Sequence, residues 1–224
     1  MANLWLRVTQ LDTFVNWTSG LDTVGILDKL TSYTPPTYAM QYGTAVGEMV
    51  ERGLFDWPEG EPYLIQGRTK VVVDTAILRA FGELYRGGLW AAAAFEVPGL
   101  YKLASGAHTL TLTGTADAIS GLTLYEHKTT HKTPDYTDSL QWQVYLEMFQ
   151  LPVVAYYIAE VTETARKFKE MHQQTFWRTP ESTANVELAC RMFIDWVTRN
   201  KFEGYFTTPS KKYLSLTTDG SLFD

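Results

Sequence analysis

The chain has 224 residues and a formal net charge of −6, and 45% of its residues are hydrophobic against 20% charged. These values are typical of a globular protein, and the length predicts a single domain over residues 1–224. The acidic balance argues against a protein that coats nucleic acid non-specifically, and the apolar runs are too short for a membrane span. The N-terminus shows no secretory signal, and the single cysteine, Cys190, excludes a disulfide framework within one chain, so we expect a reducing, cytoplasmic setting.

The first part of the chain has mostly helical periodicity. Apolar residues recur at helical spacing over residues 10–30, with a break near Ser19–Gly20, and a second helix is expected from about Tyr38 to Leu54. A further helix is expected over residues 74–85, with strand before it.

Strands are expected in the middle of the chain. Three extended runs cover residues 90–98, 108–120 and 122–129, and Ser120–Gly121 supplies a tight turn between the last two. A helix with an apolar stripe is expected at residues 135–149, where Asp135 or Thr137 can act as N-cap. Two more strands and a long helix are expected at residues 152–161, 173–178 and 180–201. This order predicts an α/β fold with a mixed central sheet flanked by helices and with helical additions at the N-terminal side.

Two acids and a lysine lie along the expected hairpin of residues 114–130. Residues two apart in a strand point to the same face, so Glu126 and Lys128 share a face and His127 takes the other. Pairing across the turn can bring Asp117 close to Glu126. Two adjacent carboxylates are costly to bury unless a cation joins them, and Mg²⁺ prefers carboxylate, water and phosphate oxygens. The hairpin therefore predicts a Mg²⁺ or Mn²⁺ site in which Lys128 holds the attacking water or helps to deprotonate it.

An ordinary cross-strand salt bridge on an exposed sheet face would use the same residue types. The neighbourhood favours burial instead, because the flanking residues are apolar: Ala116, Ala118, Ile119, Leu122 and Leu124.

The stretch "GTADAIS…LYEHKTT" resembles the core of the PD-(D/E)xK nuclease superfamily, in its RecB-like and phage-exonuclease branch. The pattern G-x-x-D followed by E-x-K and small hydroxyl residues falls on Gly114, Asp117, Glu126, Lys128, Thr129 and Thr130. Ala116 stands where the superfamily name has proline. The resemblance implies a restriction-endonuclease-like core, with the backbone carbonyl of His127 as a further metal ligand.

A second motif of this branch lies beyond the lysine strand. Gln141 and Tyr145 match its Q-x-x-x-Y pattern, and a spacing of four residues places both side chains on one helix face. The resemblance implies that they contact substrate phosphate or brace Lys128. An isolated pattern of this kind would indicate only a half-exposed helix face.

A third motif precedes the hairpin. The stretch "QYGTAVGEMVERGLF" resembles the G-x-x-x-H/E helix of the branch, with Gly43 as its glycine, but Gly47 stands where His or Glu completes the metal shell. Glu48 lies one residue later, and Glu51 lies one turn beyond Gly47 on the same face. Either acid is a candidate metal ligand, and Glu51 is favoured.

The resemblance implies a Mg²⁺- or Mn²⁺-dependent DNA exonuclease of phage type, without the iron–sulfur cysteines of some relatives, that acts in recombination or DNA processing. DNA, a recombination or single-strand-annealing protein and further copies of the chain are the implied partners, inside a phage-infected or bacterial cell. The expected catalytic residues are Asp117, Glu126, Lys128, Gln141 and Tyr145. Exonuclease or endonuclease action, polarity and strand preference are left open.

Two alternatives of other classes use the same residues. One is a catalytically inactive nuclease-fold module that binds DNA or protein, which Gly47 supports. The other is an unrelated small-molecule binder whose strands carry a salt bridge and bind no metal.

Overall fold

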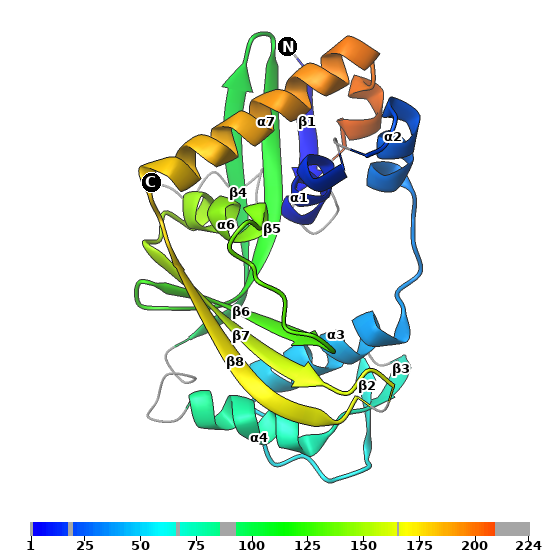
Figure 1. Ribbon diagram of the computed structural model, residues 1–224, viewed down its shortest axis with the longest axis vertical. Coiled ribbons are helices and arrows are strands. Elements are labelled where there is room, and N and C mark those ends of the chain that lie inside the picture. Colours follow the sequence, from blue (N-terminus) through cyan, green and yellow to red (C-terminus); the bar gives the residue numbers. More distant parts are fainter. Residues whose placement is uncertain (1, 18–19, 66–67, 86–92, 165, 209–224) are drawn as a thin grey trace.

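A computed structural model describes residues 2–17, 20–65, 68–85, 93–164 and 166–208 (Figure 1). Its main element is a six-stranded sheet in the order β1-β5-β6-β7-β8, with β4 also paired to β5. The strands are β1 (Ala2–Arg7), β4 (Ala94–Ser105), β5 (His108–Ser120), β6 (Thr123–Thr130), β7 (Val153–Val161) and β8 (Phe168–Trp177). The pairs β1–β5 and β6–β7 are parallel and the others are antiparallel, so the predicted mixed sheet is confirmed.

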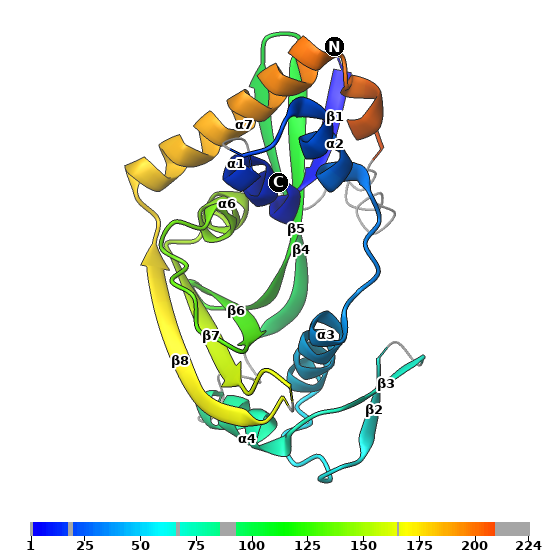
Figure 2. The same ribbon diagram turned by 45° about the vertical axis from the view of Figure 1, so that its right-hand side comes forward.

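Helices cover both faces of this sheet. One face packs against α1 (Val8–Trp17), α2 (Thr23–Thr31), α6 (Leu140–Phe149) and α7 (Pro180–Asn200), and a 3-10 turn at Glu203–Phe206 comes after α7. The other face packs against α3 (Tyr38–Glu51), α4 (Thr75–Leu84) and a hairpin of β2 (Pro62–Ile65) and β3 (Thr69–Val72). In both views α6 and α4 lie on opposite sides of β6, β7 and β8 (Figure 1, Figure 2).

Alternation along the strands produces the two cores. In β7, Tyr156 and Ile158 belong to the core beneath α6 and α7, whereas Tyr157 and Ala159 belong to the core beneath α3 and α4. A strand buried on both faces reads as a continuous apolar run, as β7 does. Every helix in the described part of the chain is too short or too polar to serve as a membrane span.

The predicted helices and the turn are found, with shifted ends. The break between α1 and α2 falls where it was expected, and Gly121 takes a positive φ of 57° in the β5–β6 turn. The third helix ends at Glu51 instead of Leu54, and the strand β8 is longer than predicted. Residues 90–92 of the first expected strand lie outside the described residues.

The structure differs from the sequence-based expectation at three places. The first strand, β1, was missed because a short apolar run at the N-terminus carries no distinct period. The α6 helix begins at Leu140 with Ser139 as its N-cap, because the Asp135 carboxylate instead accepts from the backbone and hydroxyl of Thr137. Leu122 is 69% exposed, because it belongs to the turn and not to the strand face.

The helix α6 is held in place by a hydrogen bond from its N-terminus to Asp12, and two glycines of the sheet allow it to pack closely. The Asp12 carboxylate of α1 accepts from the backbone N–H of Leu140 at 2.8 Å, which adds a second cap to α6. A Cβ atom on Gly114 would lie 2.6 Å from the ring of Tyr145, and one on Gly99 would lie 2.6 Å from Met148 and Phe149. Glycine at these strand positions therefore lets α6 approach the sheet closely.

We predict that Gly114→Ala lowers the free energy of unfolding by about 1–3 kcal/mol, because the added methyl group overlaps the Tyr145 ring. The matched control is Gly43→Ala in α3, where a Cβ atom would meet no described atom within 4 Å. Alanine is favoured over glycine in a helix by about 1 kcal/mol, so the control should be stabilised. Urea unfolding measures both, and equal effects would contradict the close approach of α6.

Candidate metal centre

The candidate site lies where the sheet divides. Along one edge β5 pairs with β4, whereas along the other its pairing with β1 ends at Thr113 and its pairing with β6 begins at Ala118. The segment between them, residues 114–117, is the G-x-x-D stretch. The hydroxyl of Tyr145 donates to the carbonyl oxygen of Thr115 at 3.1 Å, which satisfies a backbone acceptor inside this segment.

The two acids are held in different ways. Asp117 has 30% of its side chain exposed, and its Oδ2 accepts from the backbone N–H of His127 at 2.7 Å. Glu126 is only 4% exposed, and its Oε1 accepts from Lys128 Nζ at 2.8 Å and from Gln141 Nε2 at 3.2 Å. The other oxygen, Glu126 Oε2, is buried without a hydrogen-bond partner among the described residues. A buried carboxylate oxygen in this state needs a proton, a cation or a water molecule as its partner.

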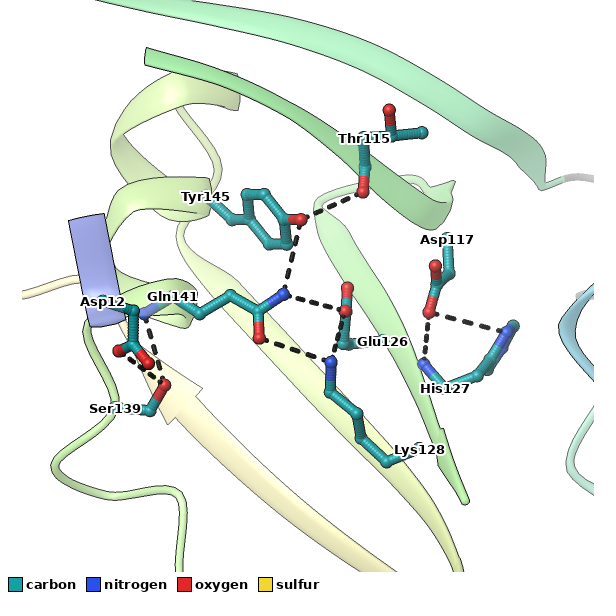
Figure 3. A network of polar contacts seen from close by, with 9 residues as sticks. All are labelled: Asp12, Thr115, Asp117, Glu126, His127, Lys128, Ser139, Gln141 and Tyr145. Atoms are coloured by element: carbon teal, nitrogen blue, oxygen red, sulfur yellow. Dashed lines mark hydrogen bonds and ion pairs between the residues drawn. The ribbon is translucent and has the colours of Figure 1, made fainter. Parts of the chain in front are cut away.

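A chain of hydrogen bonds joins the lysine to the motif helix. The Lys128 ammonium donates to Gln141 Oε1 at 3.3 Å, and the Gln141 amide lies 3.4 Å from the Tyr145 hydroxyl. Figure 3 shows this amide between Tyr145 on one side and Glu126 with Lys128 on the other. The Lys128 ammonium also lies 5.6 Å from the ring centroid of Tyr156, on the adjacent strand β7. The structure thus brings the Q-x-x-x-Y and E-x-K residues into one network.

The acids of the site have strongly perturbed pKa values. Burial raises the pKa of Glu126 to about 7, and the carboxylate of Asp117 adds to this rise while Lys128 opposes it. Burial also raises the pKa of Asp117 to about 6, again against the charge of Lys128. Burial alone would lower the pKa of Lys128, but Glu126 and Asp117 outweigh it and raise that pKa. The negative charge of the site therefore exceeds what its lysine balances.

The two acids of α3 relate to the site in different ways. The carboxylate of Glu48 accepts from the hydroxyl of Tyr63 at 3.1 Å, on the β2–β3 side of the helix. The charge of Glu51 is among the smaller contributions that raise the pKa of Asp117, after burial, which is the largest. The charge of Glu51 therefore reaches Asp117, and after burial and Glu48 it also contributes to the raised pKa of Tyr63.

Sequence reasoning missed one acid near the site. Glu96 lies on β4 between the residues that pair with Ala116 and Ala118, and its φ is +50°. Its charge also helps to raise the pKa of Asp117, after the larger effect of burial. An acid in an apolar strand is a weak signal, and only the pairing of β4 with β5 places it beside Asp117.

The donor set fits a divalent cation. The site has two carboxylates, and one of their oxygens is unpartnered among the described residues. The pKa values of both acids are raised, as expected at a site where a cation takes the place of bound protons. A different group, Glu160, Glu170 and His172, has donor atoms within 4.8 Å of one another. In that group Lys169 and Thr133 already donate to the carboxylate of Glu160, so we interpret it as an ion-pair network.

Comparisons with known proteins match the fold. The sequence matches no family model and no curated protein. A solved structure from Eubacterium rectale, named as a candidate exonuclease, is 13% identical with a TM-score of 0.52, covering 94% of this chain and 85% of that one. LHK-Exo, solved in complex with dAMP, is 12% identical with a TM-score of 0.45, covering 88% of this chain and 90% of that one. At this identity the first likeness shows that the fold, a mixed sheet flanked by helices, is similar to that protein's fold.

We predict that, in the presence of EDTA, the free energy of unfolding falls as the pH rises from about 5 to about 8, by on the order of 1–3 kcal/mol. A group whose pKa is higher in the folded protein stabilises the fold below its unfolded pKa, and this stability is lost as the pH passes the folded pKa. The values of about 6 for Asp117 and about 7 for Glu126 set this range. Burial lowers the pKa of His127 to about 4, which opposes the fall below about pH 6.5, so the fall should be steepest above that pH. Urea unfolding at a series of pH values measures it.

Two variants test the assignment of this pH dependence. Glu126→Gln cannot ionise, so its stability should fall less over the same range. The control is Glu147→Gln, since Glu147 is also 4% exposed. Burial raises the pKa of Glu147, but hydrogen bonds from Arg178 and Thr183 outweigh burial and lower it. This control should keep the fall of the wild type, and an undiminished fall in Glu126→Gln would contradict the assignment.

Proposed function

We propose that the protein is a Mg²⁺- or Mn²⁺-dependent deoxyribonuclease that hydrolyses phosphodiester bonds by in-line attack of water. The observation that carries this proposal is the grouping of Asp117, Glu126 and Lys128, in which the ammonium pairs with Glu126 at 2.8 Å and the charges of Asp117 and Lys128 both act on Glu126, with one buried oxygen of Glu126 unpartnered among the described residues. Two carboxylates beside an ammonium are the side chains that phosphodiester hydrolysis with a divalent ion requires.

Three groups of the chain would hold the metal: the carboxylates of Asp117 and Glu126 and the backbone carbonyl of His127. When bound, the ion would polarise the phosphate and stabilise the leaving oxygen. Glu51 would complete the outer shell in place of the residue that the family has at Gly47, because its charge acts on Asp117 while Glu48 is bonded to Tyr63.

Lys128 would position the attacking water. The charges of Glu126 and Asp117 raise its pKa against the effect of burial, which favours the charged ammonium as a hydrogen-bond donor. An ammonium has three N–H groups, and Glu126 and Gln141 accept two of them in the described network. The third can hold water or a phosphate oxygen.

Gln141 and Tyr145 would keep the lysine in place. Gln141 contacts both Glu126 and Lys128 through its amide, and Tyr145 connects that amide to the backbone of Thr115. Of the two roles that the motif implies, these contacts favour bracing of the lysine over direct contact with substrate.

Exonuclease action of the phage type is the finer form of this proposal. It is supported by the three motifs and by a fold like that of a protein named as a candidate exonuclease. DNA is then the substrate, and a single-strand-annealing protein and further copies of the chain are the proposed partners.

A catalytically inactive DNA-binding module is the second candidate, because Gly47 stands at a metal-ligand position. The site itself argues for activity, since Asp117, Glu126 and Lys128 are all present and joined by hydrogen bonds to their neighbours.

We predict that wild-type protein with Mg²⁺ degrades end-labelled linear DNA and that Lys128→Ala lowers the rate by about 100-fold or more. Circular DNA should be spared if the enzyme needs an end. The matched control is Lys169→Ala, which removes a lysine paired with Glu160 and should keep wild-type activity. Equal rates for wild type and Lys128→Ala would remove Lys128 from the mechanism. A folded wild type that is inactive with both Mg²⁺ and Mn²⁺ would instead support the inactive module.

A further inference from the structure

The middle residue of the E-x-K motif, His127, is held by Phe81 of α4 and by Tyr85, the residue that caps the C-terminus of α4. Its side chain is 6% exposed, and its ring lies edge to face with Phe81 at 5.1 Å and with Tyr85 at 5.8 Å between centroids. The Tyr85 hydroxyl lies 2.5 Å from His127 Nε2, and Tyr85 is itself 3% exposed. A position that the motif leaves open is therefore one of the most constrained side chains near the site.

The hydrogen bond to Tyr85 determines which nitrogen of His127 carries the proton. Among the described residues, His127 Nε2 is the hydrogen-bond partner of the Tyr85 hydroxyl. If the hydroxyl did not donate to Nε2, its proton would be buried without an acceptor. Tyr85 therefore donates to Nε2, and a neutral imidazole with Nε2 as acceptor carries its proton on Nδ1. His127 Nδ1 lies 4.0 Å from Asp117 Oδ2, so this N–H faces the carboxylate.

The same residue also reaches Asp117 through its backbone. His127 N–H donates to Asp117 Oδ2 at 2.7 Å, and the ring Nδ1 faces the same oxygen from 4.0 Å, which is beyond hydrogen-bond distance (Figure 3). The clamped ring also fixes the backbone of His127, whose carbonyl is a proposed metal ligand.

We propose that His127 and Tyr85 are positioning residues that orient the carboxylate of Asp117 and the backbone of His127 for a divalent cation. This inference rests on the proposed function. It assigns α4, which carries no motif residue, the task of holding the metal ligands in place, as residues that hydrogen-bond to metal ligands commonly do.

The test is Mn²⁺ binding by isothermal titration calorimetry, which needs no DNA and no turnover. His127→Leu should weaken Mn²⁺ binding about tenfold, the size of effect typical for groups that orient metal ligands. Tyr85→Phe keeps the aromatic packing and removes the hydroxyl, and it should weaken binding in the same direction by less. His127→Asn should restore most of the affinity, because its amide nitrogen can take the place of Nδ1.

Two controls make the result specific. Tyr42→Phe removes the hydroxyl of another tyrosine in the same core, which is 1% exposed and bonds to Arg166 and Asp74. Tyr42→Phe should lower the melting temperature and leave the Mn²⁺ affinity unchanged. If His127 had a purely structural role, His127→Leu would likewise lower the melting temperature without changing the Mn²⁺ affinity. The second control is Asp117→Asn. The heat of Mn²⁺ binding that this variant loses belongs to the candidate site, and the heat that it keeps belongs elsewhere, for example to the group of Glu160, Glu170 and His172.

The outcomes separate this inference from the proposed function. Wild-type Mn²⁺ affinity in His127→Leu and Tyr85→Phe, with the wild type active on DNA, would overturn the positioning role alone. Failure of the wild type to bind Mn²⁺ would overturn the proposed metal centre and this inference with it. If His127→Leu does not fold, Tyr85→Phe decides the question, because it removes a single hydroxyl.

Discussion

The structure depends on the closeness of two acidic side chains that are largely withdrawn from water. Burial raises the pKa values of Asp117 and Glu126 to about 6 and about 7, and the charge of Asp117 adds to the rise at Glu126, while one ammonium, Lys128, does not balance both charges. Such a pair is stable only when protonated or when a cation joins it. We interpret the hydrogen bonds around this pair as a scaffold that holds the two carboxylates in place for a cation.

The scaffold uses both faces of the sheet. On one face, α6 is brought close by Gly114 and capped by Asp12, and it carries the residues that contact Glu126 and Lys128. On the other face, α4 holds the ring of His127, whose backbone holds Asp117. Because the sheet divides at residues 114–117, side chains from the two layers reach the same point.

Features that depend on local period and spacing could be predicted from the sequence. Alternation along β6 placed Glu126 and Lys128 on one face and His127 on the other, and the turn at Gly121 placed Asp117 opposite Glu126. The roles of these residues stay predictions. Contacts between distant segments could not be read from the sequence: Glu96 beside Asp117, Asp12 as a second cap of α6, and Tyr85 against His127 are 21, 128 and 42 residues from their partners along the chain. No local pattern encodes such pairings.

Crystals soaked in Mn²⁺ and measured at a wavelength where manganese scatters anomalously give the most direct test of the central claim. The account predicts a manganese peak bonded at about 2 Å to carboxylate oxygens of both Asp117 and Glu126, with the Glu51 side chain nearer to it than that of Glu48. Strong manganese peaks elsewhere, for example only at Glu160, Glu170 and His172, with none between Asp117 and Glu126, would contradict it.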